Sequence, residues 1–229
     1  MATTALPIPD SDAITSTRVL LCEGSGDKNF YQELIKVRKL PDFYVTHPRE
    51  TIDPGGRQGF SSRLRGLKTQ HGFDAVTGII VASDNDRDQK GSLTEVKKLI
   101  HDAGFRTPNH PLVTIAGPPA MCIMMIPFAE DGQLETLCLR AIREAWPIQY
   151  KCAEQYATCT GISGNWKPAK IERAMLRSLT SHICKEDPNT SLAYHWHDKR
   201  EIVIPLDHAC FTPIADFLAG FDVAITAAS

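Results

Sequence analysis

The stretch of sequence that decides the fold reads V-T-G-I-I-V-A-S-D-N-D, residues 76–86. Its apolar part, within 75–82, has the length and composition of a buried β-strand, and two aspartates, Asp84 and Asp86, follow it directly. In open α/β sheets, functional side chains gather at the carboxyl ends of the parallel strands. The pattern therefore predicts a strand that delivers two carboxylates, both pointing the same way, to the edge of a sheet.

A second run of the same form lies near the start of the chain. The short apolar stretch at 18–22 leads into Glu23-Gly24-Ser25-Gly26-Asp27. If this strand is a neighbour of the later one, Glu23, Asp84 and Asp86 meet at one edge of the sheet. Carboxylates that are close together repel one another, and a hard divalent cation with oxygen ligands relieves that repulsion. The two clusters together predict a metal site for phosphate chemistry.

The pattern of apolar residues predicts the domain organisation. Further strands are expected at 43–46, 112–116 and 121–127, and they alternate with helices at 27–39, 59–70, 92–103 and 133–146. This alternation predicts an α/β fold of Rossmann-like kind, with a mostly parallel sheet covered by helices on both faces. We expect a flexible arm at 1–16, the α/β domain at 17–147 and a mainly helical extension at 148–229 that packs on this domain. Within that extension, helices are expected at 148–160, 168–183 and 213–221, and an extended segment at 194–205.

The amino-acid composition indicates what kind of protein this is and in which cellular compartment it is expected. The chain has 229 residues, of which 42% are hydrophobic and 23% charged, as expected for a globular protein with a sizeable core. Its formal net charge is −2, so a nucleic-acid partner would need a local basic patch. The seven cysteines are odd in number and form no C-x-x-C pair, which is typical of a reducing compartment. Without a signal-peptide pattern or a long apolar run, we expect a cytoplasmic protein with no membrane partner.

The order of the acidic motifs resembles the Toprim domain, which is shared by topoisomerases, bacterial primases, a ribosomal-RNA maturase and the OLD (overcoming lysogenization defect) nucleases. The Toprim signature is a glutamate after the first strand, here Glu23, and a later D-x-D, here Asp84-Asn85-Asp86. The match is closest to small stand-alone and OLD-like Toprim proteins. They add an E-G-x-x-D stretch, here residues 23–27, and a G-x-L-E stretch, here Gly132-Gln133-Leu134-Glu135. The resemblance covers about residues 17–145 and implies a Toprim-like sheet.

The resemblance also implies an activity, namely a divalent-metal-dependent nuclease that hydrolyses phosphodiester bonds with one or two Mg²⁺ or Mn²⁺ ions. OLD nucleases use a lysine from beyond the Toprim core as well, and they carry an ATPase half that this sequence lacks. Any ATP-dependent control would thus need a separate ATPase or another protein subunit. The implied site residues are Glu23, Asp84 and Asp86 for the first ion, Asp27 and Glu135 for a second, and Lys170, or else Lys167, as the catalytic lysine.

Each of these residues also has an ordinary structural interpretation. Aspartate and asparagine are common turn formers after strands, so a lone D-x-D is weak evidence. Glu135 falls in the first turn of an expected helix, where the helix dipole favours an acid. Lys170 opens an amphipathic helix, where a lysine is usually solvated. Asp88 is interpreted as a helix-capping or solvated residue, and Ser83 as a hydroxyl that satisfies the strand end.

A group of basic residues follows the Gly55-Gly56 turn. On a helix near the acidic edge they would contact the backbone of a nucleic acid, with DNA as the expected substrate, although a solvated helix face explains them equally well. The group consists of Arg57, Arg63, Arg65 and Lys68. In the C-terminal part, His195-Trp196-His197 and His208-x-Cys210 have spacings that suit zinc, but without a fuller zinc signature they are interpreted as surface histidines and a buried thiol.

Two alternatives to the nuclease stay open. The chain fits a non-catalytic Toprim subunit that binds nucleic acid or serves an assembly in DNA repair or anti-phage defence. It also fits another magnesium-dependent phosphoester hydrolase. A phosphatase with an aspartate nucleophile, however, needs its D-x-D after the first strand, where this chain has Glu23. The sequence does not indicate an oligomeric state, nor does it distinguish DNA from RNA.

Overall fold

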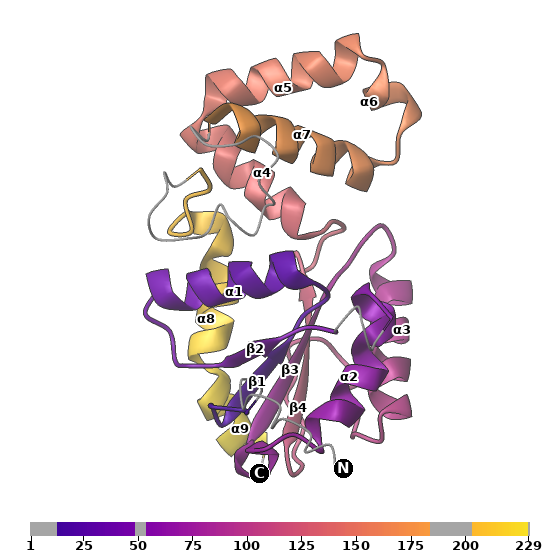
Figure 1. Ribbon diagram of the computed structural model, residues 1–229, viewed down its shortest axis with the longest axis vertical. Coiled ribbons are helices and arrows are strands. Elements are labelled where there is room, and N and C mark those ends of the chain that lie inside the picture. The colour runs from indigo at the N-terminus through magenta and orange to yellow at the C-terminus, as the bar shows by residue number, and fades with distance from the viewer. Residues whose placement is uncertain (1–12, 49–53, 184–202, 229) are drawn as a thin grey trace, which may run out of the picture.

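The computed structural model describes residues 13–48, 54–183 and 203–228. Its centre is a four-stranded parallel sheet in the order β2-β1-β3-β4 (Figure 1). The strands are β1 (Arg18–Leu21), β2 (Tyr44–Thr46), β3 (Gly78–Asp84) and β4 (Ala120–Ile126). β1 lies beside β3, with Leu21 in register with Val81. The α/β fold class is therefore confirmed, and the segments that follow β1 and β3 begin at the same edge of the sheet.

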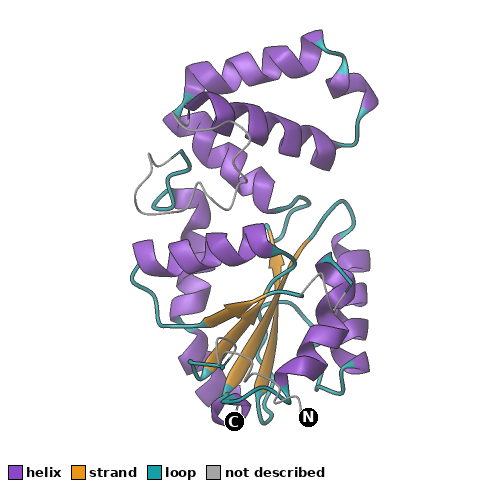
Figure 2. Cartoon of the chain, viewed as in Figure 1, coloured by secondary structure: helices purple, strands orange, loops and turns teal. Residues whose placement is uncertain are grey.

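Helices cover both faces of the sheet (Figure 2). On one face lie α1 (Ser25–Val37), α8 (Thr212–Ala219) and α9 (Phe221–Ala228), and on the other lie α2 (Phe60–Leu67) and α3 (Gln89–Asp102). The remaining helices are α4 (Leu134–Ala145), α5 (Pro147–Cys159), α6 (Ile162–Asn165) and α7 (Pro168–Ile183), with short 3-10 turns at Gly56–Gly59, Phe73–Ala75 and Ala209–Phe211.

Two apolar cores result from the alternation of side chains along the strands. Leu20 and Ile80 belong to the core that α1, α4 and α8 share, whereas Leu21 and Val81 belong to the core beneath α2 and α3. All four side chains are fully buried. Strands of a parallel sheet that are covered on both faces are expected to be apolar at every position, which explains the unbroken hydrophobic runs in the sequence.

The C-terminal third divides into two parts. Helices α5, α6 and α7 pack together and against α4, beyond the carboxyl edge of the sheet (Figure 1). Helices α8 and α9 instead return to the sheet. The ring of Phe211 lies 5.3 Å from that of Phe30 on α1, and a Cβ on Gly78 of β3 would come within 2.8 Å of the Phe221 ring. The last two helices thus complete the layer that α1 begins, because one helix does not cover that face.

Three expectations need correction or comment. The strand expected at 112–116 does not form. Leu112 has a left-handed φ of 62°, which interrupts an extended backbone, and only Ile115 makes an isolated antiparallel bridge, to Met121. The expected arm lies mostly outside the described residues, but Ile14 is buried and its N–H donates to the carbonyl of His71 at 2.8 Å. Most of the extended segment expected at 194–205 also lies outside them.

The described residues contain six free cysteines and no disulfide. Within the same residues, no single helix has the length and apolar character to cross a membrane, although the pair Ala209–Ala219 and Phe221–Ala228, bent by 41°, passes that test when taken together.

Candidate acidic site

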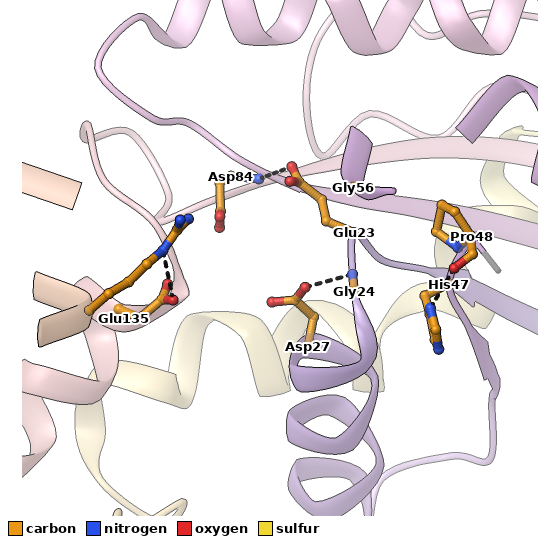
Figure 3. Close-up of a pocket in the computed structure, with 9 residues that line it drawn as sticks. Glu23, Gly24, Asp27, His47, Pro48, Gly56, Asp84 and Glu135 are labelled. Carbon is orange, nitrogen blue, oxygen red and sulfur yellow. Dashed lines mark hydrogen bonds and ion pairs between the residues drawn. The ribbon is translucent and has the colours of Figure 1, made fainter. Parts of the chain in front are cut away.

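Four carboxylates line one cavity at the carboxyl edge of the sheet, with a volume of about 180 Å³ (Figure 3). Each comes from a different place in the chain. Glu23 follows β1, Asp27 lies in the first turn of α1, Asp84 ends β3, and Glu135 lies in the first turn of α4. Arg173 of α7 also lines the cavity. The structure therefore brings together four of the five acids that were expected to hold metal.

Glu23 is fixed to the end of β3. Its Oε1 accepts hydrogen bonds from the Ser83 hydroxyl at 2.5 Å, the Asp84 N–H at 3.1 Å and the Arg57 Nε at 3.2 Å. Ser83 thus satisfies a carboxylate rather than only the strand end. These contacts orient the carboxylate at the junction of the two neighbouring strands, as the pairing of β1 with β3 requires.

Asp27 caps the helix that it opens. Its Oδ2 accepts the Gly24 N–H at 2.8 Å, as expected for an acid at a helix N-terminus. Burial, followed by repulsion from Glu23 and Glu135, raises the pKa of Asp27 to about 7. This carboxyl therefore gains and loses its proton close to neutral pH.

Asp84 connects the central strand to α4. Its Oδ1 accepts the Leu134 N–H at the start of that helix, at 3.1 Å. Burial, together with the charges of Asp27, Glu23 and Glu135, raises the pKa of Asp84 well above its ordinary value. The middle residue of the D-x-D, Asn85, is buried and donates to the carbonyl of Glu130, so it ties down the loop that leads into α4.

The cationic residue of the cavity is Arg173, where Lys170 was expected. Arg173 Nε lies 3.3 Å from Glu135 Oε1, and its Nη2 donates to Gln133 Oε1 at 2.9 Å. Lys170 is exposed and does not line the cavity; its Nζ lies 3.8 Å from the centroid of the Trp166 ring. Arg173 is three residues further along the same helix, so the helical spacing was a signal that sequence reasoning missed.

Asp86 does not line the cavity, contrary to expectation. The D-x-D prediction assumed an extended backbone, but β3 ends at Asp84 and Asp86 has a left-handed φ of 52°. Its carbonyl accepts the Gly132 N–H at 2.6 Å. Its half-exposed carboxylate instead pairs with Arg57, with Nη2 and Oδ2 2.9 Å apart. Asp88, as interpreted, caps α3 by accepting the Gly91 N–H.

The basic residues near the Gly55-Gly56 turn contact the protein itself. The side chain of Arg57 is only 10% exposed and bonds to Glu23, Asp86 and other groups around the strand ends. Arg63 is buried, and its Nη2 donates to Thr46 Oγ1 at 2.7 Å. These two side chains therefore do not form the exposed basic face that the helical spacing suggested.

The other two basic side chains tie α2 to the end of α3. Arg65 donates to the carbonyl of Asp102 at 3.0 Å. Lys68 donates to the carbonyl of Ala103 at 2.9 Å, and its Nζ lies 4.1 Å from the centroid of the Phe105 ring. Arg65 and Lys68 stay exposed, so their contact with nucleic acid remains a prediction, whereas the cavity receives its cationic side chain from α7.

The donor set of the cavity suits a hard divalent ion, because every acidic side chain offers carboxylate oxygen. The contacts described above use Glu23 Oε1, Asp27 Oδ2, Asp84 Oδ1 and Glu135 Oε1. As placed, however, no three histidine, cysteine, aspartate or glutamate side chains of the described residues form a group that could hold a metal ion.

The zinc spacings do not produce a metal cluster either. His208 Nδ1 accepts the Cys210 N–H at 3.1 Å, and its Nε2 lies 2.9 Å from a carboxylate oxygen of Glu144. His195 and His197 lie outside the described residues. Protein contacts account for His208 without a metal.

The fold and the site define an α/β protein with an acidic cavity at the carboxyl edge of its sheet. The chain belongs to the family described as "Protein of unknown function (DUF3226)", whose model matches residues 17–218. The matched residues include the four carboxylates and Arg173. Comparison with curated proteins and with solved structures gave no match.

Proposed function

We propose that the chain is a divalent-metal-dependent nuclease of Toprim type, which hydrolyses phosphodiester bonds in nucleic acid in the cytoplasm. The observation that supports this proposal is the convergence of Glu23, Asp27, Asp84 and Glu135 on one cavity. Gathering partly buried acids costs free energy, and carboxyls with strongly raised pKa values in a cleft are typical of functional sites. The motif order that resembles Toprim proteins selects phosphodiester chemistry among the reactions of such a site.

The chain's own residues divide the work as follows. Glu23 and Asp84 would hold the first ion and Asp27 and Glu135 a second, with Mg²⁺ or Mn²⁺ as the cofactor. When bound, such ions polarise a phosphodiester and activate a water molecule. The hydroxyl of Ser83 orients Glu23, and backbone N–H groups orient Asp84 and Asp27.

Helix α7 supplies the surface that contacts the substrate. Arg173 lines the cavity, and Lys170 is exposed on the same helix beside the Trp166 ring. A guanidinium and an ammonium are suited to phosphates, and an indole that is 38% exposed offers a face on which a base can stack. We propose that a nucleic-acid strand, with DNA as the expected substrate, follows this helix into the cavity. Lys170 then binds substrate rather than the reacting atoms.

The experiment is cleavage of supercoiled plasmid and of end-labelled single-stranded DNA and RNA by the purified chain. Cleavage that appears with Mg²⁺ or Mn²⁺ and disappears with EDTA supports the proposal. Cleavage that is equal in EDTA, or absent on all three substrates with either ion, contradicts it. The three substrates also distinguish DNA from RNA and single from double strands.

One observation favours a second candidate, a non-catalytic subunit that binds nucleic acid. In the described residues, no group of acids is placed to hold a metal, and each cavity carboxylate already has a protein partner. Such a subunit binds nucleic acid equally well in EDTA, shows no cleavage, and co-purifies with a separate ATPase or another protein partner.

A further inference from the structure

A line of exposed cationic side chains runs along one side of α7. Lys170, Arg173 and Arg177 are spaced three and four residues apart, so they lie on the same face of the helix, over a length of about 10 Å. The helix contains one acidic residue, Glu172, whose Oε2 accepts the Thr136 hydroxyl of α4 at 2.8 Å, so its charge is directed towards α4. The exposed face of α7 is therefore positive and suits a polyanion.

An exposed aromatic ring stands at one end of this line. Trp166 lies just before α7 and is 38% exposed, and Lys170 Nζ lies 3.8 Å from the centroid of its ring. Proteins that bind single-stranded nucleic acids combine cations for the phosphates with aromatic faces for the bases. The bases of a duplex are stacked on one another, so only an unpaired base offers its face to an indole. The combination of Trp166 with a row of cations therefore favours a single strand.

The line also passes the mouth of the acidic cavity. Arg173 lines that cavity and is 58% exposed, so a phosphate bound to its guanidinium would lie beside Glu135, with which Arg173 is paired. The cavity has a volume of about 180 Å³, below the roughly 300–1,000 Å³ of ordinary ligand pockets. It therefore has room for part of one strand at most, and a paired duplex does not fit.

Helix α7 is held in this position by a buried glutamine at the start of α4. Gln133 is 1% exposed, its Nε2 donates to the carbonyl of Ala169 at 3.0 Å, and its Oε1 accepts a hydrogen bond from Arg173 Nη2 at 2.9 Å. One amide thus connects the first turns of α7 to the helix that carries Glu135. The cationic face is therefore in place before a ligand binds, which lowers the entropic cost of binding.

We propose that α7 is a preformed binding surface for single-stranded nucleic acid and that the chain discriminates against duplexes. One base stacks on Trp166, and phosphates of the same strand contact Lys170, Arg173 and Arg177, so the strand crosses the mouth of the cavity at Arg173. An acidic peptide suits the same cations but has no base for the indole. The proposal rests on the proposed function for the class of substrate, nucleic acid, and adds that the strand is unpaired.

The test is fluorescence anisotropy of a labelled single-stranded DNA oligonucleotide, and of its duplex with the complement, titrated with the full chain in EDTA so that cleavage is not the readout. We expect the wild type to bind the single strand about tenfold or more tightly than the duplex. Trp166→Ala should lower the affinity for the single strand by about tenfold and that for the duplex by less than about twofold. The matched control is Tyr156→Ala, which removes an exposed aromatic ring from α5 and should change neither affinity.

Equal affinity of the wild type for the two forms, or a folded Trp166→Ala variant that binds the single strand as the wild type does, would overturn the proposal. So would binding of a poly-glutamate peptide with the affinity of the single strand and no effect of Trp166→Ala, because the partner would then be an acidic protein. Should Trp166→Ala fail to fold, Arg177→Ala replaces it. The slope of log affinity against log salt concentration should then decrease by about 0.7, and an unchanged slope contradicts the proposal.

These outcomes are separate from those of the nuclease test. Preference for the single strand that depends on Trp166, without cleavage in Mn²⁺ or Mg²⁺, contradicts the nuclease and supports this surface. Metal-dependent cleavage together with tighter binding of the duplex contradicts the surface and leaves the nuclease in place.

Discussion

The guanidinium of Arg173 on α7 and the carboxylate of Glu135 join the α5–α7 helices to the acidic cavity, with Nε and Oε1 3.3 Å apart. Arg173 is 58% exposed and Glu135 20%, so the pair lies at the mouth of the cavity rather than in its interior. A positive charge in this position faces any anionic substrate that approaches the four acids. The α5–α7 helices therefore contribute a residue to the site.

Replacement of Arg173 by alanine should separate its two roles. An exposed ion pair contributes about 0–1 kcal/mol, so the free energy of unfolding should change by no more than that. Loss of a phosphate contact should weaken binding of single-stranded DNA in EDTA by about tenfold, a loss of the size expected for a charge-assisted hydrogen bond. Fluorescence anisotropy measures the affinity. Arg106→Ala, which removes an exposed arginine that donates to the Ala116 carbonyl away from the cavity, is the control, and an equal loss in both variants would contradict the assignment.

Asp27→Asn should stabilise the metal-free protein at high pH. The wild-type carboxyl has a pKa of about 7 in the fold against an ordinary value of 3.8, so above pH 3.8 the unfolded chain releases a proton that the folded protein keeps. This penalty is absent below pH 3.8, grows through the interval and is complete above pH 7. Asparagine stays neutral and escapes it. We expect a gain on the order of a few kcal/mol at pH 8 and none near pH 3.5.

Urea denaturation in EDTA measures that gain at the two pH values. The exposed aspartate Asp74, replaced by asparagine, serves as the control and should show no comparable rise. A stability difference between Asp27→Asn and the wild type that does not grow with pH would refute the assignment of a raised pKa to Asp27.

Lys170→Ala should reveal whether α7 guides nucleic acid. If the ammonium contacts one phosphate, the slope of log affinity against log salt concentration should decrease by about 0.7 for single strands. Lys151→Ala, an exposed lysine on α5, should leave the slope unchanged. Binding of labelled oligonucleotides across a salt series in EDTA gives both slopes. Identical slopes for Lys170→Ala and the wild type would remove this helix from the binding surface.

Phe221→Ala tests the role of α9 in the fold. The Phe221 side chain is fully buried and its ring lies 6.1 Å from that of Phe43, so its removal should cost about 3–5 kcal/mol of unfolding free energy. Val223 on the same helix is 74% exposed, and Val223→Ala should stay within about 0.5 kcal/mol. Chemical denaturation measures both. Similar small effects for the two variants would mean that α9 is not part of the core.

Much of the fold follows from local pattern. The apolar runs before Glu23 and Asp84 predicted two buried strands, and β1 and β3 are indeed neighbours. The helix bounds at 134–145 and 168–183 lie close to the expected ones. These elements could be predicted because burial on both faces, helical periodicity and proline leave direct marks in the sequence. The extension was expected to pack on the α/β domain, but not that α8 and α9 would be the helices that return to the sheet, because short apolar helices do not indicate which surface they cover.

The site was harder to predict where a single backbone angle or helix rotation decides. The left-handed φ of Asp86 turns its carboxylate away from the cavity, and no local sequence pattern predicted that angle. Rotation of α7 places Arg173, not Lys170, beside Glu135. The basic residues after the Gly55-Gly56 turn looked solvated or DNA-binding, yet Arg57 and Arg63 are largely buried. Partners that lie far apart in sequence determine these outcomes.

The central claim, that this acidic cavity hydrolyses phosphodiester bonds with a divalent ion, is tested most directly by the cleavage rate of Asp84→Asn in Mn²⁺. The control is Glu130→Gln, which removes a carboxylate that pairs with Arg140 outside the cavity. Loss of an ion that supplies several kcal/mol of transition-state stabilisation should lower the rate of Asp84→Asn by about 100-fold or more. The control should cleave like the wild type. A folded Asp84→Asn protein that cleaves as fast as the wild type would contradict the account.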